Sequence, residues 1–67
     1  MIRVPVTSSN LVSLGWEEGV LEVEFRRGIV YRYEGVPEEV YRKLLFAESP
    51  GKEFESEVKR QFDGVRV

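Results

Sequence analysis

Three runs of alternating apolar and polar residues fill the centre of the chain, at residues 11–16, 20–25 and 29–34. A repeat of two is the pattern of a strand that buries one face, because successive side chains point to opposite sides. Two glycine-containing segments, Glu18-Gly19 and Arg26-Arg27-Gly28, separate the runs and have the lengths of hairpin turns. We therefore predict three antiparallel strands in chain order, a β-meander.

The apolar residues also select the register of this meander. A two-residue first turn gives every apolar residue an apolar partner: Trp16 with Leu21, Leu14 with Val23, and Val12 with Phe25. The second turn keeps this match only as a three-residue loop with a left-handed Gly28. It then pairs Phe25 with Ile29, Val23 with Tyr31, and Leu21 with Tyr33. The same register sets Glu22 opposite Arg32 on the outer face.

Helical spacing replaces strand spacing in the second half of the chain. Pro37 suits the first turn of a helix, and the acidic pair that follows it suits the positive end of the dipole. Apolar residues then recur along one side of this helix: Val40, Tyr41, Leu44, Leu45 and Ala47.

A second helix is expected after a break at residues 48–51. Ser49 suits the N-cap and Pro50 the first helical position. Its buried stripe repeats every fourth residue, at Phe54, Val58 and Phe62. Gly64 is the expected C-terminal cap.

Together these elements predict one α+β domain over residues 1–67, a three-stranded antiparallel β-meander followed by two α-helices packed on one face. Seven apolar residues are expected to share its core: Trp16, Leu21, Phe25, Tyr31, Leu44, Phe54 and Val58. Residues 65–67 have no pattern that places them, and the sheet edge is one option.

The chain contains neither cysteine nor histidine. This excludes disulfides, zinc sites with thiolate or imidazole ligands, and serine–histidine or cysteine–histidine catalysis. We expect a non-enzymatic protein with no cofactor and no metal. No apolar run approaches the roughly 18 residues that a membrane span needs, and no signal-peptide pattern begins the chain, so we expect a cytoplasmic protein with no membrane partner. Frequent Glu, Lys and Arg with few thermolabile residues hint at a thermophilic source.

Three groups of residues are candidates for a binding site, and each also has a structural interpretation. The first is Tyr31-Arg32-Tyr33, which has the composition of a stacking platform with a cation, as in proteins that bind single-stranded nucleic acid. The strand alternation equally allows both tyrosines to lie in the core beneath the helices.

The second group is Ser8-Ser9-Asn10, which offers hydroxyls and an amide to phosphate or sugar oxygens, or forms an ordinary turn. The third is basic. Lys52 stands at the expected start of the second helix, where backbone N–H groups attract anions, or it lies beside a helix start that is simply capped. Arg26-Arg27 and Arg42-Lys43 form a patch only if the fold gathers them, and separate solvated positions are the alternative.

A longer series of residues keeps the order and spacing of a known domain along nearly the whole chain. It comprises Ser8-Ser9-Asn10, Ser13-Leu14-Gly15-Trp16, Leu21-Glu22-Val23-Glu24-Phe25, Gly28, Tyr31-Arg32-Tyr33, Gly35-Val36-Pro37, Tyr41, Leu44, Ala47, Ser49, Gly51 and Arg66-Val67. In this series the chain resembles the KTSC domain family. Trp16 stands where that family often has tyrosine.

The KTSC family takes its name from the C-terminal region of some lysyl-tRNA synthetases, and it also occurs as stand-alone bacterial and phage proteins. The resemblance implies RNA binding without aminoacylation, because the chain has no synthetase catalytic domain. We therefore expect a small non-catalytic module that binds single-stranded or structured RNA. The expected site residues are Tyr31, Arg32, Tyr33, Arg26, Arg27, Lys52, Ser8, Ser9 and Asn10. The alternative hypothesis is a protein-interaction or regulatory module that binds a larger protein partner.

Overall fold

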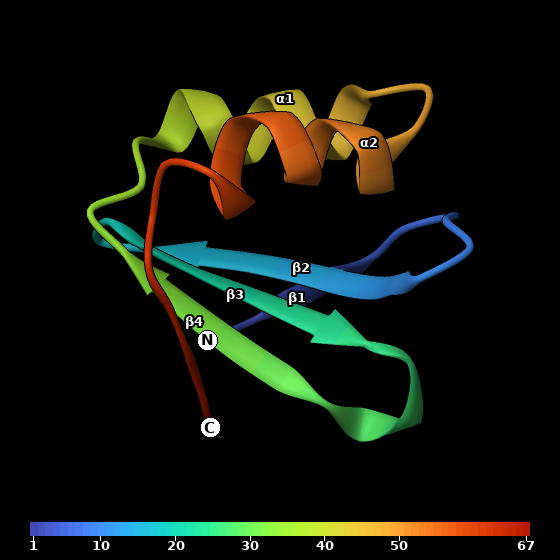
Figure 1. Cartoon of the computed structure of the whole chain (residues 1–67), viewed down its shortest axis with the longest axis horizontal. Helices are drawn as coiled ribbons and strands as arrows, with labels where there is room; N and C mark the ends of the chain where they lie inside the picture. The colour runs from blue at the N-terminus through green and yellow to red at the C-terminus, as the bar shows by residue number, and fades with distance from the viewer.

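The computed structural model describes residues 1–67 and shows a twisted sheet with helices over one face (Figure 1). Five strands form the sheet: β1 (Arg3–Pro5), β2 (Leu11–Glu17), β3 (Val20–Phe25), β4 (Val30–Glu34) and β5 (Gly64–Arg66). Each strand pairs antiparallel with the next along the chain, so the spatial order is β1-β2-β3-β4-β5. The α+β class is confirmed, but the prediction of three strands is wrong.

The two missed strands are the edges of the sheet. β1 and β5 have three residues each and are exposed along their length. Segments this short cannot display the alternation by which a strand is recognised in sequence. Gly64 begins β5, opposite Tyr33, so the prediction that it caps the second helix is wrong. Residues 65–67 do lie at the sheet edge, where the Val67 N–H donates to the Val30 carbonyl at 3.0 Å.

The predicted register is confirmed between β3 and β4, where Leu21 pairs with Tyr33 and Val23 with Tyr31. The connection is the short 3₁₀ segment η1 (Arg26–Gly28), and Gly28 has the expected positive φ, +74°. Arg27 is also left-handed, with φ of +70°, which the sequence did not predict.

The register between β2 and β3 is correct for Trp16 and Leu14 but wrong at the end of the hairpin. Phe25 pairs with Leu11 and not with Val12, because a β-bulge falls between Leu11 and Ser13. The bulge inserts one extra residue on β2, so the inward-facing position passes from Val12 to Leu11. Leu11 is accordingly buried, whereas Val12 is half-buried.

The helical layer consists of α1 (Glu38–Phe46), α2 (Pro50–Phe54) and the π-helical segment η2 (Glu55–Lys59), which continues α2 without a break. Ser49 occupies the N-cap position and Pro50 the first turn, as predicted. The second helix ends earlier than expected, so Phe62 lies in the turn beyond it, although its side chain still packs on the core. No helix has the length and apolar character that crossing a membrane requires.

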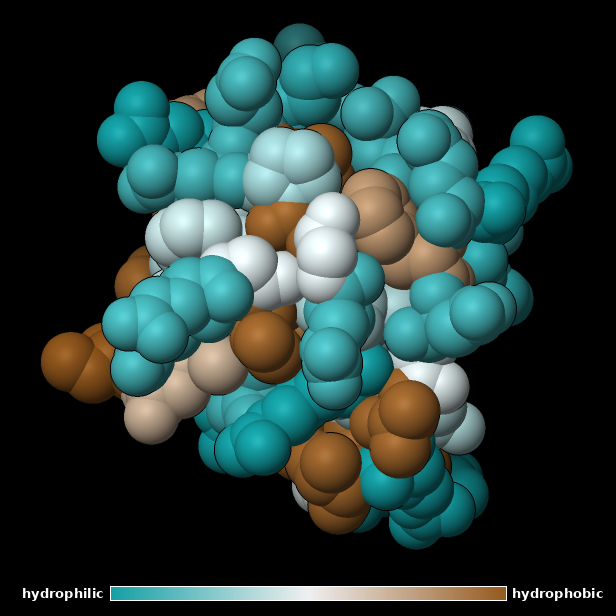
Figure 2. Space-filling model, turned by 90° about the vertical axis from the view of Figure 1, so that its left-hand side faces the viewer, coloured by the Kyte–Doolittle hydropathy of each residue, from teal (hydrophilic) through white to brown (hydrophobic).

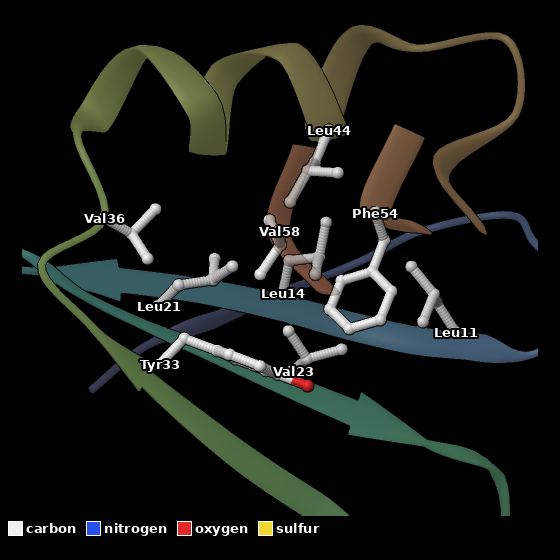
Figure 3. Close-up of a cluster of buried hydrophobic side chains, with 9 residues drawn as sticks. All are labelled: Leu11, Leu14, Leu21, Val23, Tyr33, Val36, Leu44, Phe54 and Val58. Carbon is white, nitrogen blue, oxygen red and sulfur yellow. The ribbon is translucent and has the colours of Figure 1, made fainter. Parts of the chain in front are cut away.

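Nine buried side chains form the core between the sheet and the helices (Figure 3). They are Leu11, Leu14, Leu21, Val23, Tyr33, Val36, Leu44, Phe54 and Val58. Of the predicted core, Leu21, Leu44, Phe54 and Val58 belong to this cluster. The prediction is confirmed for these four, whereas Trp16, Phe25 and Tyr31 pack against the cluster and are only partly buried. The Trp16 Nε1–H also donates to the Val36 carbonyl at 2.8 Å, which ties β2 to the connection that leads into α1.

Candidate nucleic-acid interface

The fold brings two of the predicted groups together in one cleft of about 590 Å³, here called the polar cleft. Its lining contains no apolar side chain other than proline and comprises residues 7–10 and 48–52 together with Glu55, Ser56 and Arg60. The Ser8-Ser9-Asn10 segment therefore faces Lys52 across the start of α2. These groups are 40 or so positions apart in sequence, and only the packing of α2 against the β1–β2 connection makes them neighbours.

Hydrogen bonds hold the Ser8–Asn10 turn in one conformation. The Ser8 Oγ accepts from the backbone N–H groups of Asn10, at 3.4 Å, and Leu11, at 3.3 Å. The same hydroxyl donates to Asn10 Oδ1 at 3.1 Å. A serine hydroxyl has one proton to donate, so this pattern assigns the Asn10 oxygen to Ser8 and turns the Asn10 Nδ2 away from it.

Arg26 supports this turn from the β3–β4 hairpin. Its Nε donates to the Ser9 carbonyl at 2.6 Å, and its guanidinium also donates to the Ser8 carbonyl at 3.0 Å. Arg26 was expected to contact nucleic acid directly. The structure shows that its guanidinium holds the Ser8–Asn10 turn of the polar cleft, and direct contact with nucleic acid stays a prediction.

Gly51 lets the turn and α2 approach each other closely. A β-carbon at this position would lie 2.7 Å from Asn10 Oδ1 and 3.3 Å from Ser8 Oγ. Real β-carbons do not come that close to another atom, so any larger residue would have to displace the Asn10 side chain. The glycine thus fixes where Asn10 stands in the cleft.

A second concave surface, here called the aromatic hollow, adjoins the polar cleft and measures about 390 Å³. It is lined by Asn10, Phe25, Ile29, Tyr31, Tyr33, Phe54, Glu55, Lys59 and Arg66. Asn10 and Glu55 line both the cleft and the hollow, so the two form one continuous surface.

The aromatic rings of the hollow pack on one another. Tyr31 and Tyr33 are stacked with centroids 6.4 Å apart, and Phe25 meets Tyr31 edge-on at 5.9 Å. Phe54 meets both Phe25 and Tyr33 edge-on. Tyr33 is only 6% exposed, and burial, with a smaller contribution from Tyr31, raises the pKa of its phenol. Tyr33 therefore belongs to the core, and Tyr31 and Phe25 present the accessible aromatic surface.

Arg32 is not part of this surface. Its side chain lies on the opposite face of the sheet, where its Nε contacts the buried Glu22 carboxylate at 2.7 Å. Arg3 approaches the same carboxylate at 3.5 Å. The strand alternation that turns Tyr31 and Tyr33 toward the helices necessarily turns the residue between them outward.

The remaining predicted basic residues do not gather into one patch. Arg27 lies at the tip of the β3–β4 hairpin, while Arg42 and Lys43 lie on α1, which covers the sheet (Figure 1). Arg42 pairs with Glu38 and Lys43 with Glu57.

Other basic residues line the polar cleft and the aromatic hollow. Four basic side chains have neither a salt bridge nor a side-chain hydrogen bond: Arg27, Lys52, Arg60 and Arg66. Lys52 and Arg60 line the polar cleft, and Arg66 lines the aromatic hollow. Arg60 and Arg66 were not among the predicted site residues. The spacing of Lys52, Ser56 and Arg60 by four residues is the signal that would have placed Arg60 on one side of the helix with Lys52.

The sequence profile of the KTSC domain matches residues 7–62, most of the chain. The chain belongs to the KTSC domain family. A crystal structure of a KTSC domain protein from Yersinia pestis has the same fold, with a TM-score of 0.91 and 34% identity, covering 98% of this chain and 96% of that one. An uncharacterized protein of Stutzerimonas stutzeri is 51% identical over 63 residues, which are 91% of this chain and 89% of the relative. A protein of Tsukamurella paurometabola is 40% identical over 65 residues, 94% of this chain and 97% of its own length.

The polar cleft lies entirely within the residues that the KTSC profile matches. All residues of the aromatic hollow except Arg66 lie within them as well. The candidate interface is therefore built from the body of the KTSC domain, with Arg66 added by β5.

Proposed function

We propose that this KTSC domain is a non-catalytic module that binds RNA through the polar cleft and the aromatic hollow. In this proposal the domain acts in the cytoplasm and needs no cofactor. One observation carries it, the local charge of this surface. The cleft and hollow together hold four basic residues, Lys52, Lys59, Arg60 and Arg66, against two acidic ones, Glu48 and Glu55.

The surface thus has a net charge of +2 on a chain whose net charge is −2. Phosphate groups are attracted by such local cations, and hydroxyl and amide groups of the cleft add hydrogen bonds to phosphate and sugar oxygens. Aromatic side chains beside the cations are the usual second component of a surface that binds single strands.

The test is fluorescence anisotropy of a labelled tRNA and a labelled single-stranded RNA across a salt series. Two to four phosphate contacts predict a slope of log K against log salt of roughly −1.4 to −2.8 on a single strand. The double variant Lys52→Ala/Arg60→Ala should reduce the magnitude of this slope by about 1.4, since it removes two contacts. The double variant Arg42→Ala/Lys43→Ala is the matched control, because it removes the same charge from α1 outside the surface.

Equal losses in the two double variants would mean that net charge alone governs binding, and the assigned surface would be wrong. If neither RNA binds at about 100 μM protein in low salt, the proposed function is contradicted. This protein concentration corresponds to the weak end of non-specific affinity.

A protein-interaction role is the second candidate, and one observation favours it. The Phe46 side chain at the end of α1 is 85% exposed and borders a groove of about 500 Å³ whose apolar wall includes Val4 and Leu45. Exposed apolar side chains that form a patch mark protein contacts. On the face that Figure 2 shows, hydrophilic residues predominate and hydrophobic ones appear as separate patches. Loss of a protein partner in Phe46→Ser, with retention in Lys52→Ala/Arg60→Ala, would favour this second function.

A further inference from the structure

The polar cleft and the aromatic hollow differ in chemistry although they are continuous. The cleft is lined by hydroxyl, amide and charged groups, whereas the hollow is walled by aromatic rings. A ligand that fills both must combine a polar, anionic part with a flat apolar part. A nucleotide in a single strand has this composition, with its phosphate and ribose on one side and its base on the other.

Asn10 stands at the boundary between the two and has a free donor. Its Oδ1 already accepts a hydrogen bond from the Ser8 hydroxyl, which has only one proton to donate. No side-chain hydrogen bond in the protein uses the Asn10 Nδ2. The amide nitrogen is thus available to donate to an acceptor atom on the edge of a base.

Tyr31 supplies the accessible ring of the hollow. One side of it stacks on Tyr33, and Tyr31 is itself half-buried, so its ring is held in place before any ligand arrives. Arg66 is its neighbour across the β4–β5 pairing on the same face of the sheet. An unpaired cation therefore stands beside a base that lies against Tyr31.

We propose that the aromatic hollow receives one unstacked base of a single-stranded RNA, while the polar cleft holds the adjoining ribose and phosphate. This inference rests on the proposed RNA-binding function and specifies its ligand. Duplex RNA is a poor ligand for such a site, because its bases are stacked and paired inside the helix.

The first experiment compares an intact short oligouridine with the same strand lacking all its bases, using unmodified protein and fluorescence anisotropy. Stacking of one base predicts that the abasic strand binds about 5- to 150-fold more weakly. A strand with one 2-aminopurine should also change its fluorescence when it binds, because stacking on an aromatic ring quenches that base. Equal affinity for intact and abasic strands would overturn the inference, as would equal affinity for duplex and single-stranded RNA.

Variants then locate the base. Tyr31→Leu should weaken binding of the intact strand and leave the affinity for the abasic strand unchanged. Asn10→Asp still accepts from the Ser8 hydroxyl but loses the amide donor. Because it also adds a negative charge that repels phosphate in either strand, it should weaken binding of the intact strand more than binding of the abasic strand. Phe46→Ala removes an exposed aromatic ring outside the hollow and is the matched control, with no expected change. Thermal denaturation verifies that each variant is folded, and the abasic comparison on the unmodified protein decides the matter if Tyr31→Leu does not fold.

The outcomes separate the inference from the function on which it rests. If intact and abasic strands bind equally, and Lys52→Ala/Arg60→Ala abolishes both, the base hollow is wrong and RNA binding through the cleft stands. If neither strand binds but the labelled tRNA does, the inference is wrong and the proposed function stands. If the tRNA does not bind either, the proposed function fails and the inference fails with it.

Discussion

The ring of Tyr33 lies directly over Gly64 where β4 pairs with β5, in the space that a β-carbon at position 64 would occupy. Gly64 therefore serves to let the last strand approach a buried aromatic ring, and the contact links the edge of the sheet to the core. Tyr33 in turn packs edge-on against Phe54 at 5.6 Å.

Gly64→Ala should destabilise the protein by about 1–3 kcal/mol, because the added methyl group overpacks this contact. Denaturant unfolding measures the loss. Combined with Tyr33→Leu, which removes the ring that collides, the alanine should cost markedly less than it does alone. Additive losses in this double-mutant cycle would show that the destabilisation has another origin.

The buried Glu22 carboxylate on the outer face gives a second prediction. Glu22→Gln should cost about 1 kcal/mol in denaturant unfolding, because the amide oxygen can still accept from Arg32 but lacks the charge that strengthens this hydrogen bond at a buried position. Arg42→Ala, which breaks an exposed pair on α1, is the control and should cost no more than about 0.5 kcal/mol.

Arg32→Ala distinguishes the two faces of the sheet. It should lower the stability of the protein but leave RNA affinity unchanged, because the aromatic hollow is on the other face. A loss of RNA affinity comparable to that of Lys52→Ala/Arg60→Ala would move the interface to the outer face.

Gly28 has a left-handed backbone conformation, which a side chain would strain. Gly28→Val should cost about 1 kcal/mol or more, because a β-branched residue is strained at a φ of +74°. No side chain lies near the position of its β-carbon, so the loss would report backbone strain alone. An unchanged melting temperature would contradict the three-residue loop.

Gly51→Ala is expected to separate stability from binding. Alanine favours a helix over glycine by up to about 1 kcal/mol, and the atom that it meets is the end of the Asn10 side chain. The fold should therefore persist while Asn10 is displaced and RNA affinity falls. Denaturation and anisotropy on the same sample measure the two effects, and unchanged affinity would show that the position of Asn10 does not matter.

Alkaline pH should weaken the fold through Tyr33 and Tyr41. Burial raises the pKa of both phenols, and Tyr31 raises that of Tyr33 further. The unfolded chain therefore releases these protons first, so the free energy of unfolding should be insensitive to them below about pH 10 and fall above it. Chemical denaturation between about pH 9 and pH 11 measures this fall, which should be smaller in Tyr33→Phe. An identical pH dependence in that variant would contradict the role of Tyr33.

The sequence predicted those parts of the fold in which local pattern and packing agree. The β3–β4 register followed from the apolar face and Gly28, and Pro50 marked the start of α2. The β-bulge at Val12 was not predictable, because both Leu11 and Val12 are apolar and either satisfies the buried position. The edge strands were missed because their pairing depends on neighbours and not on their own residues.

The candidate site was predictable in its pieces and not in its assembly. Asn10 and Lys52 were identified from their chemistry, but their proximity depends on Gly51. This residue has no β-carbon, and a β-carbon there would collide with the Asn10 side chain. The support that Arg26 gives to the Ser8–Asn10 turn was not predictable, because the two carbonyl groups that accept from it are invisible in sequence. The thermophilic origin suggested by composition stays a prediction.

The hydrogen bond from Trp16 to the Val36 carbonyl also gives this protein a built-in optical reporter. Trp16 is the only tryptophan, so its emission comes from one location, where the sheet meets the chain entering α1. Detachment of the helical layer would expose the indole to water and shift its emission to longer wavelength. Because Trp16 lines neither the cleft nor the hollow, this signal follows folding without a label and independently of a fluorescent RNA.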